Sequence, residues 1–304
     1  MKIGASLRSG YGPMDPREGA RWMIERARAV RDAGLDSLFV GDHHNVAVPY
    51  YQNVAMLGRL LAEWDDRPAG ALFLLPLWHP VLVAEQVGTL ASIAAGPFVM
   101  QCAIGGGAQQ FDAFDVSLRA RVRRFEAALD VVRRLCAGDE VSTDEPYRIV
   151  RARIAPVPPA PLEVWIGASA PAAIDRAARL GDADLVGPEA TPAEARRLID
   201  FYREACARHG REPGTIAIRR DVHVGADDAD AERVAGPVIA RGYRGFDPAA
   251  PLSGGVNRVA AGIAELGDMG YTDVIVRHLA DDQSDVLRSY ARLAAVRAAV
   301  QPAR

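Results

Sequence analysis

Residues 164–187, VWIGASAPAAIDRAARLGDADLVG, decide the fold class because they contain a strand, a helix and a second strand in direct succession. The apolar run 162–168 predicts the first strand. Pro171 opens a helix that continues to Leu180, since proline lacks only an N–H that the first helical turn would leave unpaired. The run 183–187 predicts the next strand. Two strands joined through a helix imply a parallel pair with a right-handed crossover.

The same alternation continues along the whole 304-residue chain. Apolar runs and helical periodicity predict the following strands and helices. The predicted strands are 2–7, 35–41, 69–75, 98–104, 162–168, 183–187, 215–226 and 272–279. The predicted helices are 16–33, 54–64, 80–95, 118–136, 171–180, a helix capped by Thr191 that runs to about residue 209, 228–241, 257–267 and 283–299.

Eight strand–helix units without a central linker favour an α/β fold, specifically a closed (β/α)₈ TIM barrel. An open doubly wound sheet is the alternative, but the loop after the first strand, Arg8–Gly12, lacks the G-x-G-x-x-G pattern typical of that class. We expect one domain over residues 1–304 with two insertions. The first, 139–161, reads as a hairpin followed by a proline-rich stretch, and the second, 242–256, as a glycine- and proline-rich loop.

Composition excludes several classes of protein. Apolar residues make up 49 %, charged residues 25 %, and the net charge is −3, which favours neither nucleic acid nor an anionic membrane as a partner. No apolar run approaches the roughly 18–20 residues that cross a bilayer, and the first residues lack the apolar core of a signal peptide. Cys102, Cys136 and Cys206 are scattered and predict reduced thiols. We therefore expect a cytoplasmic protein.

In a barrel of this class, functional side chains lie at the carboxyl ends of the strands. The second strand ends in Gly41, Asp42, His43 and His44. One interpretation is a proton donor or hydrogen-bonding histidine whose tautomer Asp42 sets, and another is a structural histidine. A metal site is disfavoured, because adjacent strand residues point to opposite faces and no further ligand pattern supports it.

Two further strand ends suit a flat aromatic ligand. The segment LFLLPLWHP (72–80) is an apolar wall in which Trp78 and His79 are the functional candidates, although core packing explains some of its side chains. In IGGGAQQFDAF (104–114) the glycines either let a ligand ring approach the backbone or simply form a tight turn.

A phosphate site is predicted at Gly167, Ala168, Ser169 and Ala170. These small residues precede the helix that begins at Pro171, and a helix N-terminus offers backbone N–H groups and partial positive charge. Ser169 would cap the helix, bind the anion, or do both.

Four motifs in order, LDSLFVGDHH, LFLLPLWHPVLVAEQVGTL, FVMQCAIGGGAQQFDAF and VWIGASAPAAIDRAARLGDADLV, resemble the luciferase-like monooxygenase superfamily. The resemblance implies a (β/α)₈ barrel that binds FMN or the deazaflavin coenzyme F420 at the carboxyl ends of its strands. It implies a bulge and a non-prolyl cis bond at Leu72–Phe73, pressed against the cofactor ring. The cofactor-binding residues would be Leu72, Phe73, Gly105, Gly106, Gly167, Ala168, Ser169, Ala170 and Gly187.

The same resemblance implies coenzyme F420 as the cofactor, with FMN as the alternative, and places the catalytic pair on Asp42 and His43. The chemistry would be hydride transfer to or from a small organic substrate. The alternatives are an FMN-dependent monooxygenase and a non-catalytic flavin-binding barrel. Two departures argue against a sugar phosphate as the substrate. Gly106 stands where the sugar-phosphate dehydrogenases of the family have an acidic glutamate, and Lys2 is the one lysine of the chain.

Substrate and lid residues are expected at His44, Trp78, His79 and Arg277, and the loop 242–256 contains glycines that suit a hinge. Arg277 would contact an anionic cofactor tail or substrate, or form a surface ion pair. Family members are often homodimers. The apolar residues of helix 16–33 would serve such an interface or the core.

Overall fold

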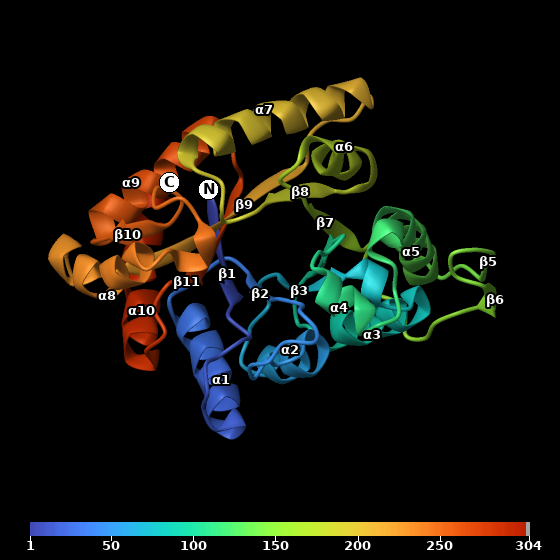
Figure 1. Cartoon of the computed structure of the whole chain (residues 1–304), viewed down its shortest axis with the longest axis horizontal. Helices are drawn as coiled ribbons and strands as arrows, with labels where there is room; N and C mark the ends of the chain where they lie inside the picture. The colour runs from blue at the N-terminus through green and yellow to red at the C-terminus, as the bar shows by residue number, and fades with distance from the viewer. Residues whose placement is uncertain (302–304) are drawn as a thin grey trace. The chain divides into compact units, whose positions relative to one another are not determined.

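The computed structural model describes residues 1–301, and parallel strands alternate with helices along them as expected for a (β/α)₈ barrel (Figure 1). The predicted fold class is therefore confirmed. The barrel strands are β1 (Lys2–Leu7), β2 (Leu38–Val40), β3 (Ala69–Leu74), β4 (Phe98–Ala103), β7 (Glu163–Gly167), β8 (Ala183–Val186), β9 (Thr215–Val224) and β11 (Asp273–His278). The principal helices are α1 (Pro16–Asp32), α2 (Asn53–Leu61), α3 (Pro80–Ile93), α5 (Arg121–Cys136), α6 (Pro171–Leu180), α7 (Pro192–Arg208), α8 (Asp228–Ala240), α9 (Val256–Met269) and α10 (Gln283–Val300).

The chain divides into two compact units, which we describe separately. Unit 1 contains Met1–Arg8, Asp15–Leu38 and the chain from Trp165 onward. Unit 2 contains Ser9–Met14 and Phe39–Val164. The prediction of a single domain over residues 1–304 stays a prediction, and residues 302–304 lie outside the described part of the chain.

Unit 1 is built on five consecutively paired parallel strands. β7 pairs with β8, β8 with β9, β9 with β11, and β11 with β1. Five of the six residues of β1 are buried, as expected for a parallel strand covered on both faces. On the outside, α6 packs against α7, α9 against α10, and α10 against α1 (Figure 1).

Unit 2 is built on β3 and β4, which run parallel from the pair Ala69 and Phe98 to the pair Leu74 and Ala103. Helix α3 packs against α2 and α5. Beyond the end of β3, Leu74 and Leu77 form an apolar cluster with Phe111, and all three side chains are buried. This cluster fixes the strand end on which several predicted site residues lie.

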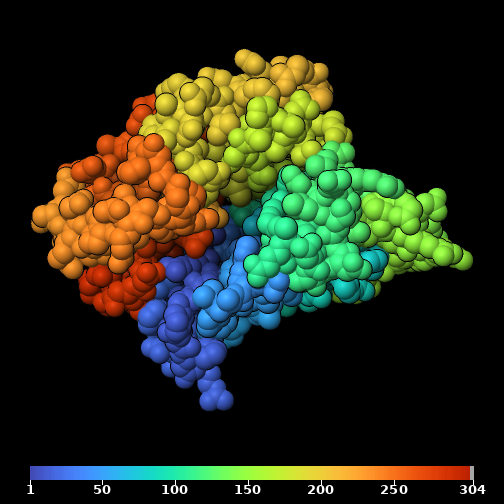
Figure 2. All heavy atoms as spheres, in the orientation of Figure 1, coloured from blue at the N-terminus to red at the C-terminus, as the bar shows by residue number. Residues whose placement is uncertain are grey.

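The first predicted insertion contains a hairpin, as expected. Strands β5 (Val141–Thr143) and β6 (Ile149–Ala152) are antiparallel. The hydroxyl of Thr143 donates to the carbonyl oxygen of Tyr147 at 2.6 Å and closes the turn. Figure 2 shows this yellow-green segment at the surface of unit 2.

Three local predictions need correction. The second strand is Leu38–Val40, shorter than the predicted 35–41, because the backbone N–H of Leu35 still bonds to Val30 of the preceding helix. The loop 242–256 includes strand β10 (Leu252–Gly254), which pairs in parallel with β9. A short helix, α4 (Ala108–Asp112), follows the glycines of the segment 104–114, where none was predicted.

The helix predicted to begin at Thr191 has the complete capping box. The backbone N–H of Glu194 donates to the Thr191 hydroxyl at 3.3 Å, and the Glu194 carboxylate accepts from the Thr191 backbone N–H at 2.8 Å. Each bond satisfies a donor that the helix end would otherwise leave without an intrahelical partner.

Thr191→Ala is expected to lower the free energy of unfolding by about 1 kcal/mol, because it removes the cap acceptor of α7. Urea denaturation measures this. The matched control is Thr89→Ala in the exposed middle of α3, where the hydroxyl bonds to a carbonyl that the helix already satisfies. Equal losses for the two variants would contradict a specific capping role.

Candidate active site

The carboxylate of Asp42, just beyond β2, is the most connected polar group of the predicted site. Its side chain is buried, and its Oδ2 accepts hydrogen bonds from the backbone N–H of Leu74 at 2.8 Å and from the Trp78 indole at 2.9 Å. Its Oδ1 lies 3.0 Å from Nε2 of His44, within ion-pair distance but without hydrogen-bond alignment. Because a buried carboxylate is costly unless it is paired, these contacts explain why it is tolerated here.

The structure corrects the predicted partner of Asp42. The sequence analysis assigned Asp42 to His43, whereas Asp42 contacts His44. Consecutive residues leave an extended segment in opposite directions, so only one of the two imidazoles can face the carboxylate. His43 is exposed, and its ring lies 5.9 Å from that of Tyr50.

His44 lies in an aromatic setting. Its ring centroid is 5.7 Å from that of Trp78 and 4.9 Å from that of Phe114. Its backbone N–H donates to the side-chain carbonyl of Gln110 at 2.9 Å, and the Gln110 amide donates to the carbonyl of Gly106 at 2.8 Å. The segments that follow β2, β3 and β4 are therefore joined through side chains, of which Asp42, His44 and Trp78 were predicted and Gln110 was not.

Gln110 and Phe114 were missed. Both belong to the segment 104–114, in which the prediction considered only the glycines as functional. Gly105 and Gly107 have φ angles of +66° and +84°, which place them in the left-handed region that favours glycine. This turn lets α4 begin, and α4 places Gln110 under His44. The polar residues after the glycines were the signal that would have predicted this.

The predicted cis bond at Leu72–Phe73 is wrong. The cis bonds of the described residues are Glu145–Pro146 and Ala155–Pro156. Strand β3 keeps its register with β4 through Leu74, without a bulge, so its backbone is already satisfied. Nothing in this regular ladder offsets the roughly 3–4 kcal/mol that a non-prolyl cis bond costs.

The two residues of that bond have different surroundings. Phe73 is fully buried, with its ring 5.5 Å from Trp78 in an edge-on arrangement. Leu72 is only partly buried and packs on the Leu74 cluster, and its carbonyl accepts from the side-chain amide of Asn53 at 2.6 Å. Of these two residues, Leu72 is the one with exposed surface that a ligand could contact.

His79 does not join the group around His44. It begins α3 without making a side-chain cap, and its ring lies edge-on to Tyr147 of the insertion at 5.9 Å. Its side chain therefore faces the hairpin.

The residues predicted to bind phosphate lie in unit 1. Ser169 and Ala170 are exposed after β7, and α6 begins at Pro171 with Ala170 at the cap position and no side-chain cap. The hydroxyl of Ser169 accepts from the backbone N–H of Gly187 at 3.3 Å, so the ends of β7 and β8 are joined. An uncapped helix start beside a hydroxyl suits an anion.

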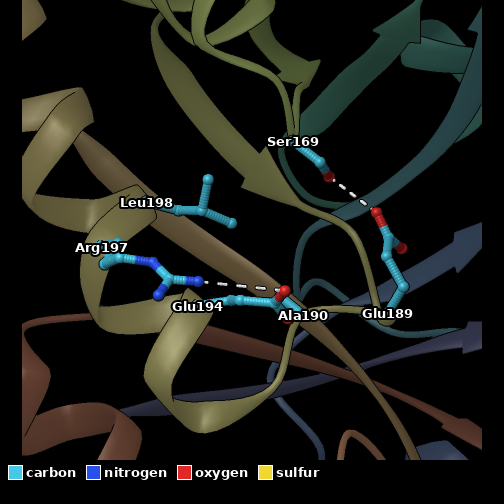
Figure 3. A pocket seen from close by; sticks show the side chains of 6 residues that line it. All are labelled: Ser169, Glu189, Ala190, Glu194, Arg197 and Leu198. Carbon is cyan, nitrogen blue, oxygen red and sulfur yellow. Dashed lines mark hydrogen bonds and ion pairs between the residues drawn. The ribbon is translucent and has the colours of Figure 1, made fainter. Parts of the chain in front are cut away.

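An anionic side chain already occupies this position. The Ser169 hydroxyl donates to the carboxylate of Glu189 at 2.8 Å (Figure 3). Both residues line a cavity of about 300 Å³ that also includes Leu198 and the ion pair of Arg197 with Glu194 (Figure 3). A Cβ on Gly187 would lie 2.3 Å from the Glu189 carboxylate, so glycine leaves room for it. Glu189 was not predicted, since nothing in its local sequence distinguishes it from a surface glutamate.

Arg277, the remaining predicted residue, lies in β11 opposite Asp221 of β9. Its Nε is buried and has no hydrogen-bond partner among the described residues. The predicted surface ion pair is not present for this arginine in the described part of the chain.

Among residues 1–301, no three His, Cys, Asp or Glu side chains come together in a way that would hold a metal ion. In the same residues, no helix combines the length and the apolar character needed to cross a membrane.

Unit 2 therefore has an acidic–histidine group after β2, and unit 1 has a helix start without a side-chain cap after β7. The sequence matches the luciferase-like monooxygenase family over residues 1–292, and the chain belongs to this family.

The chain is also similar to curated enzymes. It is 26 % identical over 243 residues to the F420-dependent glucose-6-phosphate dehydrogenase of Nakamurella multipartita, which covers 75 % of this chain and 70 % of that enzyme. It is 29 % identical to the same enzyme of Beutenbergia cavernae, over 58 % of this chain and 55 % of the relative. The chain thus spans little more than half of the second relative.

Two solved structures share the fold over nearly the whole chain. An F420-dependent secondary alcohol dehydrogenase in complex with an F420–acetone adduct aligns with a TM-score of 0.81 and 17 % identity, covering 99 % of both chains. The oxygenating constituent of a diketocamphane monooxygenase from Pseudomonas putida, in complex with FMN, aligns with a TM-score of 0.79 and 16 % identity, covering 97 % of both.

Partial loss of hydration around its ring lowers the pKa of His43 below its usual value of 6.5, although the residue keeps exposed surface. The neighbouring His44 lowers the pKa further, against a smaller opposite effect of Asp42. The neutral form of His43 therefore predominates at pH 7. Since the unfolded chain takes up this proton first on acidification, the contribution of His43 to stability is complete above pH 6.5 and is lost as the pH falls below it.

We expect the His43 imidazole to titrate with a midpoint below 6.5 in the folded protein. Carbon-detected NMR of the histidine ring signals measures it, and His43→Asn identifies the signal that disappears. A midpoint at or above 6.5 would contradict the neutral histidine that the structure indicates.

Proposed function

We propose that this protein is an oxidoreductase that uses coenzyme F420 to transfer a hydride to or from a small organic substrate. Family membership supports the class of enzyme, and the F420-dependent curated relatives support the choice of cofactor. An FMN-dependent monooxygenase is the second candidate, supported by the fold shared with an FMN-containing oxygenating enzyme. A non-catalytic flavin-binding barrel is the third.

The carrying observation is the fit of the Ser169 segment to a phosphate. We propose that the hydroxyl of Ser169, the exposed backbone of Ala170 and the uncapped start of α6 form a place for an anion. The bond from the Ser169 hydroxyl to the Glu189 carboxylate supports this, because it joins the hydroxyl to an anionic oxygen. We propose that Gly167, Ala168 and Gly187 support this segment by leaving space for the phosphate. Glu189 then has to move away from Ser169 for the cofactor phosphate to bind.

When bound, the deazaflavin would supply the hydride chemistry. The protein would bind and orient the cofactor and the substrate and would hold or transfer protons. We propose that His43 holds a proton exchanged with the substrate, because it is exposed and neutral at pH 7. Asp42 holds Leu74 and Trp78 and faces His44, so we assign it a positioning role. Leu72, Phe73, Gly105 and Gly106 are proposed to shape the surface for the ring, and His44, Trp78 and His79 the surface for the substrate.

Sugar phosphates are not the substrate that we propose. Gly106 has no side chain with which to act as an acid, and apart from Gly106 itself and its two chain neighbours no described heavy atom lies within 4 Å of the place where a Cβ would be. The substrate is instead an organic molecule with a reducible or oxidisable C=C, C=N or C–O group.

Three broader assignments belong to this proposal. A reducing cytoplasmic setting is supported by three buried cysteines that form no disulfide, Cys102, Cys136 and Cys206. We propose a homodimer because members of this family are often dimers. We propose the loop 242–256 as a lid because Gly242 and Gly245 have positive φ angles suited to a hinge.

Titration of the purified protein with coenzyme F420 and separately with FMN tests the proposal, with ring fluorescence as the signal. We expect micromolar binding of F420 and weaker binding of FMN. Tighter binding of FMN together with oxygen consumption by the reduced complex would support the monooxygenase instead. Binding of neither cofactor would overturn the proposed function.

Glu189→Gln is expected to bind the preferred cofactor about threefold more tightly, because it removes a negative charge that competes with the phosphate for Ser169. Ser169→Ala is expected to bind it about tenfold more weakly. Fluorescence titration measures both dissociation constants. Glu204→Gln, an exposed glutamate on α7, is the control and should match the parent protein. Unchanged binding in both test variants would place the phosphate elsewhere.

A further inference from the structure

An arginine cluster in unit 1 has more positive than negative charge. We define it as Arg219, Asp221, Tyr243, Arg244 and Arg277. Arg219 and Asp221 share one face of β9, since strand residues two apart point the same way. Arg277 of β11 stands opposite Asp221 in the register of the two strands. These parallel strands therefore bring two arginines to one carboxylate.

Asp221 is the acceptor at the centre of the cluster. Its side chain is fully buried, and its Oδ2 accepts from the Tyr243 hydroxyl at 2.9 Å and from the Arg244 guanidinium at 3.0 Å. Its Oδ1 lies 3.9 Å from Nε of Arg219 and has no hydrogen-bond partner in the described residues. Because Tyr243 and Arg244 come from the predicted lid, Asp221 also ties that loop to β9.

One carboxylate therefore faces three guanidinium groups. The charged groups that act on Arg219 are Arg277 and Arg244, which oppose its charge, and Asp221, which favours it. Burial, followed by repulsion from Arg277, lowers the pKa of Arg219 to about 10, so it stays protonated at pH 7. Two positive charges in the cluster lack a carboxylate counterpart among the described residues.

The guanidinium atoms are also incompletely bonded. Nε of Arg219 and Nε of Arg277 are both buried and neither has a hydrogen-bond partner in the described residues. Arg219 and Arg277 remain partly exposed as whole residues, so their other nitrogens are accessible. Buried donors of this kind normally have a partner, and planar guanidinium groups match carboxylate and phosphate oxygens.

We propose that the arginine cluster binds the anionic group, a carboxylate or phosphate, of the substrate. This inference rests on the proposed function and adds a substrate class to it, namely organic anions. Arg219 and Arg277 bind the anion, while Arg244 joins it to the lid through Asp221. Binding of the anion would thus favour one position of the loop 242–256.

The test is isothermal titration calorimetry of the whole protein at low ionic strength, with inorganic phosphate and with succinate as probes. The parent protein is expected to bind at least one probe, and Arg277→Gln to bind it at least about tenfold more weakly. Arg277→Lys should recover part of the loss. Arg288→Gln, an exposed arginine paired with Asp285 on α10, is the control and should equal the parent.

Arg219→Gln provides a second variant, and circular dichroism checks that each variant folds. Equal affinity in the parent protein and in folded Arg277→Gln and Arg219→Gln, or no binding of either probe by the parent, would overturn the proposal.

A parallel titration with F420 and FMN separates the sources of the anion. Arg277→Gln could weaken the binding of F420 and leave the binding of FMN and of small anions unchanged. In that case the arginine cluster binds the anionic tail of the cofactor, and the substrate assignment is overturned. If the parent protein binds neither cofactor while small anions still depend on Arg277, the proposed function fails and the anion site stands.

Discussion

The buried carboxylate of Asp42 is the constraint on which the candidate active site depends. A carboxylate removed from water needs partners, and this one takes the backbone of Leu74, the indole of Trp78 and the imidazole of His44. These partners come from the segments that follow β2 and β3. Their positions are therefore fixed together, and of the neighbours His43 and His44 it is His43 that is exposed.

Two groups of polar residues in unit 1 are arranged around a carboxylate. At Ser169, a glutamate carboxylate occupies the place predicted for a phosphate. In the arginine cluster, the Asp221 carboxylate is the one acidic group and faces three guanidinium groups. The Ser169 hydroxyl already has an anionic partner, whereas the arginine cluster has more guanidinium groups than carboxylates. A negatively charged ligand would balance the charge of the arginine cluster, whereas at Ser169 it would compete with the Glu189 carboxylate for the same hydroxyl.

The architecture was predictable from sequence because each element carries a local signal. Pro171 and Leu180 mark the ends of α6 as predicted, and the Thr191 capping box is present in full. Contacts distant in sequence were not predictable in this way. The choice of His44 over His43 as the neighbour of Asp42 depends on the direction in which the chain leaves β2, and the position of Gln110 depends on an unpredicted helix.

The polar residues of β9 did not stand out in an apolar periodicity. Arg219, Asp221 and His223 alternate along one face of a strand that lies between two other strands. Polar and charged residues spaced two apart in a mostly buried strand need partners, so this pattern was a usable signal for a polar site. The partners of Asp221 are Tyr243 and Arg244, and they come from a loop whose path no local sequence pattern defines.

The central claim, that the Ser169 segment holds the phosphate of a redox cofactor, is tested most directly by a crystal structure of the protein with its tighter-binding cofactor. The account predicts a phosphate oxygen within hydrogen-bond distance of the Ser169 hydroxyl, with the Glu189 carboxylate turned away. A bound cofactor whose phosphate lies elsewhere, with the bond between Ser169 and Glu189 intact, would contradict it.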